Sequence, residues 1–360
     1  MENIYAVIMA GGRGERFWPL STTSKPKQLH ELVGEKPLIA QAVDRLEGLV
    51  TNDKIFIITN IDLVEATISA VPNLNKENII GEPVGRDTAA AVACATALVK
   101  SKNKDAIFCI LTADQVMKSV EDFQLTLKAG FQLAAKNNVL ITIGIKPTFP
   151  ATGFGYIESD DEYTTELEIE FKNTKRFVEK PSFEKASSYL DTGKFYWNSG
   201  MFIWSISSIE DALKKHAPII YELMNNLYLY ACDNKILKGM DEYYPVFQKI
   251  SIDYALMEKT DNIIMACGTF DWDDVGNWNA LENHFNQDEQ NNTLIGDILQ
   301  LNSENNIVYS KEHLTALIGV KDLIVVQTDD VTLVCSKDKS QEIKAMVEKV
   351  RKDRSDSSLI

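Results

Sequence analysis

The chain has few of the residues that most often bind transition metals, with four histidines and five cysteines among 360 residues. No ligand-like spacing links the histidines, so we expect no zinc site; they are His30, His216, His284 and His313. The cysteines are dispersed and form no C-x-x-C pair; they are Cys94, Cys109, Cys232, Cys267 and Cys335. An odd, scattered set favours reduced thiols and a cytoplasmic protein.

Long apolar runs and excess positive charge are also absent. The longest apolar stretch, Ala89–Val99, has 11 residues and contains Thr96, which is too short for a membrane span and suits a buried helix. A strand pattern begins at Ile4, so we expect no signal peptide. Lysine and arginine number 37 against 52 acidic residues, a net charge of −15, which argues against nucleic acid as a partner.

A glycine-rich segment follows the first predicted strand, residues 4–9. It holds three glycines (Gly11, Gly12 and Gly14) and four cations (Arg13, Arg16, Lys25 and Lys27), with Glu15 as its one acid. Glycine lets backbone N–H groups approach a phosphate closely, and the cations match its charge. The segment therefore predicts a local anion site on an acidic protein, with an ordinary glycine turn as the alternative.

Neither of two common phosphate motifs explains this segment. The Walker pattern, glycine followed by four residues and Gly-Lys-Ser/Thr, does not occur in the chain. The dinucleotide fingerprint fails because Phe17 stands where its third glycine would follow Gly12 and Gly14.

Apolar runs alternate with helical patterns through the first half of the chain. Strands are predicted at 4–9, 54–59, 106–111 and 139–145, and helices near 37–48, 62–70, 88–100 and 121–137. This alternation favours an α/β fold with a Rossmann-like, doubly wound sheet and right-handed crossovers. Ligands bind beyond the carboxyl ends of strands in such sheets, where residues 11–27 and Asp114 lie.

The second half of the chain shows a different pattern of predicted strands and helices. Residues 150–205 are interpreted as a β-rich insertion of short, aromatic strands covering the sheet, 208–260 as mostly helical, and 262–270 as a strand. Short β segments follow at 293–298, 307–309, 314–320, 323–327 and 331–335, and then an amphipathic helix at 337–352. We expect two domains, a catalytic one over 1–284 and a β-rich one with a terminal helix over 285–360.

Two groups of carboxylates are candidate metal ligands. Asp114 follows the strand at 106–111, where a carboxylate can hold Mg²⁺ against a nucleotide's phosphates. A turn residue or helix cap is the alternative. The second group contains three acids within four residues, Asp271, Asp273 and Asp274. Their carboxylates repel one another unless a cation or hydrogen-bond donors lie nearby. A solvated acidic turn is the alternative.

The order Gly-Gly-x-Gly-x-Arg, then Pro-Leu, then Pro26-Lys27 resembles the signature of sugar-1-phosphate nucleotidyltransferases. The strings Trp18-Pro19-Leu20-Ser21 and Lys25-Pro26-Lys27-Gln28 resemble the mannose-1-phosphate guanylyltransferase branch. The resemblance implies the mixed-sheet nucleotidyltransferase fold. It also implies a small left-handed β-helix-like C-terminal domain, often used in oligomer contacts, and a homodimer.

The resemblance also implies a reaction: GTP and mannose 1-phosphate give GDP-mannose and pyrophosphate, with no covalent enzyme intermediate. Arg16 and Lys27 would hold the triphosphate with the glycine N–H groups and Arg13. Asp114 and Asp274 would hold one Mg²⁺. The family usually spells the first metal segment Leu-Pro-Ala/Ser-Asp-His, whereas this chain has Thr112 for proline and Gln115 for histidine.

A sugar-phosphate site is implied by three further strings. Phe177-Val178-Glu179-Lys180-Pro181 places Lys180 as a point charge for the attacking phosphate and Glu179 as an acceptor for hydroxyls. Asn198 has the donor and acceptor that neighbouring hydroxyls need, and Gly155 would let the backbone approach the ring. A surface ion pair and ordinary turns are the alternatives.

The loop from Glu82 to Thr88 is the predicted base-reading segment. Guanine presents N1–H and an exocyclic NH₂ side by side, and the Glu82 carboxylate can accept from both. Gly85, Arg86 and Thr88 belong to the same resemblance, while Asp87 or Thr88 can cap the following helix. Ile250–Lys259 also resembles a guanylyltransferase string, although its helical pattern is compatible with a purely structural role.

Two alternatives remain. A related enzyme would transfer GMP to another sugar 1-phosphate, such as a heptose or fucose derivative. A regulatory binding subunit would keep the fold without the chemistry, but it should lack at least one of the charged residues assigned to catalysis. All five are present: Arg16, Lys27, Asp114, Lys180 and Asp274.

Overall fold

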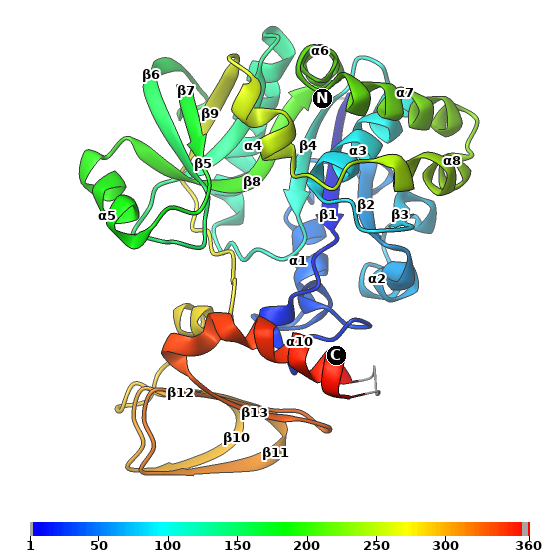
Figure 1. Ribbon diagram of the computed structural model, residues 1–360. Helices are drawn as coiled ribbons and strands as arrows, with labels where there is room; N and C mark the ends of the chain where they lie inside the picture. The colour runs from blue at the N-terminus through cyan, green and yellow to red at the C-terminus, as the bar shows by residue number, and fades with distance from the viewer. Residues whose placement is uncertain (1–2, 355–358) are drawn as a thin grey trace. The chain divides into compact units, whose positions relative to one another are not determined.

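The computed structural model describes residues 3–354 and 359–360 (Figure 1). Two compact units make up the chain. The first comprises residues 1–11, 42–113 and 117–272, and the second comprises residues 12–41, 114–116 and 273–360. Residues 1–2 and 355–358, at the outer ends of the two predicted domains, lie outside the described residues. The domain boundary between residues 284 and 285 stays a prediction.

The first unit is built on a nine-stranded sheet in the order β3-β2-β1-β4-β8-β5-β9-β7-β6. The strands are β1 (Ile4–Ala10), β2 (Ile55–Asn60), β3 (Ile79–Glu82), β4 (Ile107–Thr112), β5 (Leu140–Ile145), β6 (Tyr156–Glu166), β7 (Ile169–Val178), β8 (Phe195–Ser205) and β9 (Ile263–Gly268). Strands β1 to β4 pair in parallel, as do β5 and β9, whereas β8 is antiparallel to both β4 and β5. The predicted mixed, doubly wound sheet is confirmed.

One interpretation of the second half was wrong. The strands predicted in residues 150–205 exist, but they do not cover the sheet. Instead β6, β7 and β8 are members of it, and β8 lies between β4 and β5. Strand β3 went unpredicted because its four residues are too few to show a period.

Helices cover both faces of this sheet (Figure 1). They are α2 (Val64–Ala70), α3 (Thr88–Lys102), α4 (Val120–Lys136), α5 (Phe183–Thr192), α6 (Ile206–His216), α7 (Pro218–Cys232), α8 (Ile236–Tyr243) and α9 (Ile252–Ala255). Helix α3 is buried from Ala89 to Val99 because it lies between the sheet and α7. Helix α4 packs so closely on β8 that a side chain at Gly130 would collide with Ile203. Helix α1 (Leu38–Asp44) crosses from the second unit into the first.

The second unit contains a four-stranded sheet in the order β10-β11-β12-β13. The strands are β10 (Thr293–Leu301), β11 (Ile307–Ile318), β12 (Leu323–Gln327) and β13 (Thr332–Ser336). The first three are parallel, yet only residues 302–306 and 319–322 connect them. Parallel strands of a flat sheet need far longer crossovers, so the chain coils in a β-helix-like manner. The segments predicted separately at 307–309 and 314–320 form the single strand β11.

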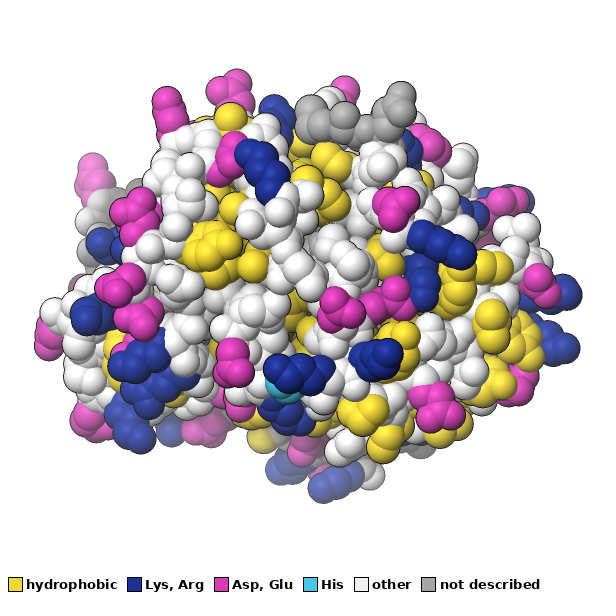
Figure 2. All heavy atoms as spheres, turned by 90° about the horizontal axis from the view of Figure 1, so that it is seen from above, with side chains coloured by type: hydrophobic (Ala, Val, Ile, Leu, Met, Phe, Trp, Pro, Cys, Tyr) yellow, Lys and Arg dark blue, Asp and Glu magenta, His cyan; other side chains and the backbone are white. Residues whose placement is uncertain are grey.

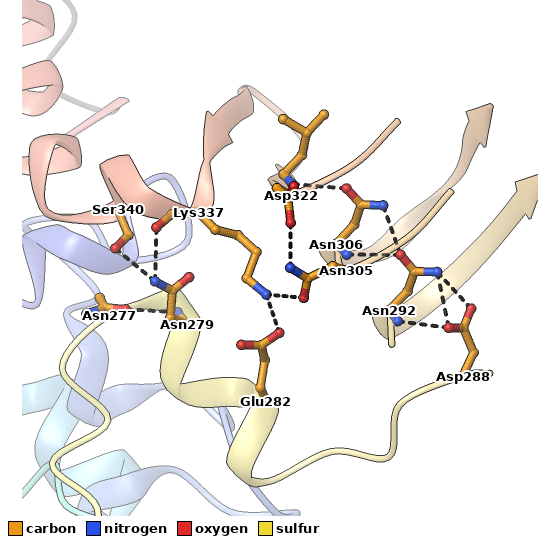
Figure 3. A network of polar contacts seen from close by, with 11 residues as sticks. Asn277, Asn279, Glu282, Asp288, Asn292, Asn305, Asn306, Asp322, Lys337 and Ser340 are labelled. Atoms are coloured by element: carbon orange, nitrogen blue, oxygen red, sulfur yellow. Dashed lines mark hydrogen bonds and ion pairs between the residues drawn. The ribbon is translucent and has the colours of Figure 1, made fainter. Parts of the chain in front are cut away.

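An asparagine ladder holds successive turns of this coil together (Figure 3). The buried Asn306 amide donates to Asn292 Oδ1 at 2.8 Å and to the Val320 carbonyl at 3.1 Å. Asn292 donates in turn to Asp288 and to the Ser303 carbonyl. These bonds satisfy buried polar groups at the corners of the coil, where no strand partner is available.

The second unit has its own core beneath helix α10 (Ile343–Asp353). Phe17 and Trp18 from the glycine-rich segment pack there with Trp278, and with Ile343 and Val347 of α10. Lys337 ties this core to the coil, because its ammonium bonds to Glu282 at 2.5 Å and to Asn305 at 2.7 Å (Figure 3). The predicted terminal helix is confirmed, with a 3-10 turn over Lys337–Glu342 before it.

No helix among the described residues is long and apolar enough to cross a bilayer. The face drawn in Figure 2 mixes acidic and basic side chains, with hydrophobic patches between them.

Candidate active site

The glycine-rich segment forms two 3-10 turns, η1 (Glu15–Phe17) and η2 (Lys27–Leu29), in the second unit. Gly14 caps η1 in the left-handed region, with φ +61°. A Cβ built on it would lie 2.4 Å from Lys27 Cβ and 2.9 Å from the Lys27 nitrogen. Gly14 is therefore required both for its conformation and for the close approach of Lys27.

Lys27 joins three segments that are distant in sequence. Its side chain is only 4% exposed, and its ammonium donates to the Asp274 carbonyl at 2.6 Å and to Asp114 Oδ2 at 3.2 Å. The structure thus brings Lys27, Asp114 and Asp274 together. Asp114 remains partly exposed, so its second oxygen is available to a ligand.

The three acids of the Asp271–Asp274 segment have different surroundings. Asp271 accepts from the backbone N–H groups of Lys118 and Ser119 and so caps a turn. Asp273 accepts from His284, Asn283 and the Val275 N–H. Burial alone would raise the pKa of Asp273, but these hydrogen bonds hold it below its usual range.

The third of these acids, Asp274, differs from Asp271 and Asp273. No hydrogen bond from another described residue reaches its carboxylate. Burial raises its pKa, the Lys27 charge opposes that rise, and the nearby Asp114 carboxylate adds to it. A half-buried carboxylate beside a second carboxylate, without donors, is a group that a cation would stabilise.

A cavity of about 240 Å³ opens beside these residues within the second unit. Its lining includes four cations, Arg13, Arg16, Lys27 and Lys344, and three acids, Glu15, Asp114 and Asp274. Arg16 makes no hydrogen bond or ion pair with another described residue, although its charge lowers the pKa of Asp274. The cavity can therefore accept an anion on its cationic side and a divalent ion at its two carboxylates.

The donor set fits magnesium better than zinc. No cluster of three or more His, Cys, Asp or Glu side chains suited to a metal occurs in residues 3–354 and 359–360. Mg²⁺ typically takes one or two protein carboxylates and completes its shell with water and substrate phosphates. Asp114 and Asp274 match that requirement.

The predicted base-reading loop belongs to the first unit, and Glu82 is buried at the end of β3. The Tyr244 hydroxyl donates to Glu82 Oε1, and a Cβ on Gly11 would lie 3.1 Å from Glu82 Oε2. Burial raises the pKa of Glu82 to about 7, although the Tyr244 hydrogen bond opposes the rise and Asp87 adds to it. Tyr244 was not predicted, since nothing in its sequence surroundings marks it.

The rest of this loop is held by the segment that follows Tyr244. Arg86 donates to the Pro245 carbonyl, and Thr88 Oγ1 accepts from the Ile252 N–H at 2.8 Å. The Asp87 side chain accepts from the Thr88 N–H and so caps α3. Of the two predicted caps, Asp87 and Thr88, the structure has Asp87. A side chain at Gly85 would meet no described atom within 4 Å.

The four predicted sugar-phosphate residues also lie in the first unit, and three of them meet. A Cβ on Gly155 would lie 2.8 Å from Glu179 Oε2 and 3.6 Å from Asn198 Cβ. Lys180, with φ +41°, turns back to pair with Glu179 at 2.6 Å and is largely exposed. Sequence reasoning missed Asp253, whose carboxylate accepts from the Asn198 amide at 2.9 Å.

Asp253 fixes the orientation of Asn198. The Asn198 carbonyl oxygen accepts from the Gly200 N–H at 3.1 Å while its NH₂ donates to Asp253. Burial raises the pKa of Asp253, the Asn198 bond opposes this, and Glu179 adds to it. The string Ile250–Lys259 contained the signal, but its helical pattern did not distinguish a site residue from a structural one.

Comparison with known proteins agrees with this geometry. A family model described as nucleotidyl transferase matches residues 5–291, and one described as a MannoseP isomerase/GMP-like beta-helix domain matches residues 296–350. The mannose-1-phosphate guanylyltransferase of Klebsiella pneumoniae is 36% identical over 97% of this chain and 74% of its own length. The chain belongs to the mannose-1-phosphate guanylyltransferase family.

Other members and solved structures extend this likeness. The mannose-1-phosphate guanylyltransferase of Escherichia coli (strain K12) is 34% identical over 97% of this chain and 74% of its own length. A crystal structure from Thermus thermophilus, described as a mannose-1-phosphate geranyltransferase, superimposes with a TM-score of 0.86 at 32% identity, covering 97% of this chain and 99% of that one. The nucleotidyltransferase fold with a small β-helix-like C-terminal domain, which the sequence resemblance implied, is confirmed for this family member.

Proposed function

We propose that the chain transfers GMP from GTP to α-D-mannose 1-phosphate, giving GDP-mannose and pyrophosphate. The observation that carries this proposal is the cavity of the second unit, which four cations and three carboxylates line in a member of the mannose-1-phosphate guanylyltransferase family. Such a lining suits a polyphosphate that arrives with a divalent ion.

The chemistry needs no nucleophile from the protein. An oxygen of the sugar phosphate attacks the α-phosphorus of GTP in line, and the bond from that phosphorus to the β-phosphate bridge breaks as pyrophosphate leaves. Arg16 and Lys27 hold the triphosphate and the leaving pyrophosphate, together with Arg13 and the N–H groups of residues 11–14. Lys180 holds the attacking phosphate. Catalysis is then positioning and neutralisation of charge.

Asp114 and Asp274 are the residues that would hold Mg²⁺. When bound, the ion neutralises negative charge on the phosphates and so lets two anions approach each other. The half-buried carboxylate of Asp274, which no donor among the described residues satisfies, supports this assignment.

The first unit supplies recognition of the base and the sugar. In its ionised form the Glu82 carboxylate accepts from N1–H and the exocyclic amine of guanine, and Gly85, Arg86 and Thr88 shape the loop around it. Glu179, Asn198 and Gly155 receive the hydroxyls of mannose. Adenine presents an acceptor at N1, which a carboxylate repels.

Location and assembly complete the proposal. The five free cysteines, three of them buried, suit a reducing compartment, and we place the protein in the cytoplasm as a homodimer.

A pyrophosphate-release assay tests the proposal with each of GTP, ATP, UTP and dTTP against mannose, fucose, glucose and heptose 1-phosphates. We expect release with GTP and mannose 1-phosphate, and at least about tenfold lower kcat/KM for every other pair. Faster release with fucose or heptose 1-phosphate would assign the chain to another sugar. No release with any pair would support a non-catalytic binding protein.

A further inference from the structure

One of the four cationic side chains that line the cavity of the second unit does not belong to the glycine-rich segment. Arg13, Arg16 and Lys27 all come from that segment, whereas Lys344 comes from α10, more than 300 residues later in the chain. Lys344 is exposed and forms no ion pair or hydrogen bond with any residue in the described part of the chain. Its charge is therefore available to a ligand in the cavity.

Buried contacts hold α10 in place beside the glycine-rich segment. Ile343 and Val347, on either side of Lys344, lie in the core with Phe17. Further along the helix, Arg351 pairs with Glu15 at 3.2 Å. The backbone of Lys344 is thus anchored to the same turn that carries Arg13 and Arg16, although its side chain stays in contact with solvent.

The charge of Lys344 is not neutralised within the first turn of its own helix. It is the second residue of α10, directly after the 3-10 turn at Lys337–Glu342, and no acid lies in the first turn of α10. The nearest acid along the chain, Glu342, pairs with Lys339 instead. Cations that line one cavity repel one another, so Lys344 and the two arginines are stabilised when an anion occupies the cavity.

We propose that Lys344 binds the terminal phosphates of the nucleoside triphosphate, and so holds the pyrophosphate as it leaves. This inference rests on the proposed function. It makes the helix after the β-helix-like coil a part of the phosphate site rather than only a structural end. Lys344 contributes charge to binding and takes no proton in the reaction.

Substitution of Lys344 by glutamine tests the proposal, with Lys349→Gln as the matched control. Lys349 is an exposed lysine of the same helix, about 140° around its axis, and does not line the cavity. For Lys344→Gln we expect the KM for GTP and the inhibition constant of pyrophosphate to rise on the order of tenfold. The KM for mannose 1-phosphate should stay constant. Lys344→Arg should recover most of the loss, and Lys349→Gln should match the wild type.

Direct titration of the protein with pyrophosphate keeps the two proposals separate. If the wild type releases no pyrophosphate from any substrate pair but binds it, and Lys344→Gln weakens that binding, the proposed function fails and the assignment of Lys344 stands. If the wild type is active and Lys344→Gln leaves both the KM for GTP and pyrophosphate binding unchanged, the assignment of Lys344 is wrong. Equal losses in Lys344→Gln and Lys349→Gln would also overturn it, because they would indicate a general effect of charge.

Discussion

The phosphate cavity of the second unit and the base-reading loop of the first handle charge in opposite ways. In the cavity, the side chains of Arg16 and Asp274 have no hydrogen-bond partner among the described residues, so both are available to a ligand. In the loop, the Glu82 carboxylate is buried against a neutral hydroxyl, and burial raises its pKa to about 7. Under the proposed function, the phosphate site leaves charges available to its ligand, whereas the base-reading site holds an acceptor in a set orientation.

The largest effect should come from removing charge from the cavity. We expect Asp274→Asn and Lys27→Ala each to lower kcat about a hundredfold or more, because losing one electrostatic stabiliser costs roughly 3–4 kcal/mol. Asp271→Asn is the matched control. Asp271 caps a turn through its side chain, which asparagine also does, and its kcat should stay near that of the wild type.

Both active-site variants are to be compared by kcat and by thermal unfolding. Asp274→Asn should unfold at or above the wild-type temperature, since a neutral amide replaces a half-buried carboxylate that lies beside the Asp114 carboxylate. Near-wild-type turnover in both variants would contradict the assignment of the cavity to catalysis.

The next effect concerns the backbone that shapes the cavity. Gly14→Ala should lower the free energy of unfolding by about 3 kcal/mol, because an alanine would be strained at φ +61° and its Cβ would collide with Lys27. Gly12→Ala is the control for stability, since a Cβ at Gly12 meets no described atom within 4 Å. Chemical denaturation measures both, and equal stability of the two variants would show that the turn tolerates a side chain at Gly14.

The smallest expected effect is the pH dependence that Glu82 of the loop gives to stability and to GTP binding. A carboxyl whose pKa is raised on folding stabilises the fold below its unfolded pKa, and this stability is lost as pH rises through about 7. Between about pH 6 and pH 8 the free energy of unfolding should therefore fall by about 1.4 kcal/mol because of Glu82. GTP binding should change in the opposite direction, since only the ionised carboxylate accepts from guanine.

Denaturation and the KM for GTP across this pH range check this pair of trends. Tyr244→Phe removes a hydrogen bond that lowers the pKa of Glu82, so both trends should move to higher pH. In Glu82→Gln both should disappear. If that variant keeps the wild-type pH dependence, another group is responsible and the assignment to Glu82 is wrong.

Local pattern was enough to predict most of the first unit. The apolar runs of β1, β2, β4 and β5 were visible because buried parallel strands need continuous hydrophobic residues. In the second unit, the glycine-rich turn and the two carboxylates of Asp114 and Asp274 were visible through their residue types. The position of β8 between β4 and β5 was not, because pairing partners depend on contacts between segments far apart in sequence.

Motif order and local composition were sufficient to assign the family, the fold class and the residue types of the candidate site, since these are properties of short segments. Which charges stay free depends instead on the folded chain. Asp273 and Asp274 are neighbours in sequence, yet hydrogen bonds satisfy the first, while no donor among the described residues reaches the carboxylate of the second. Tyr244, Asp253 and Lys344 likewise became visible only in three dimensions, because no spacing along the chain encodes contacts over tens to hundreds of residues.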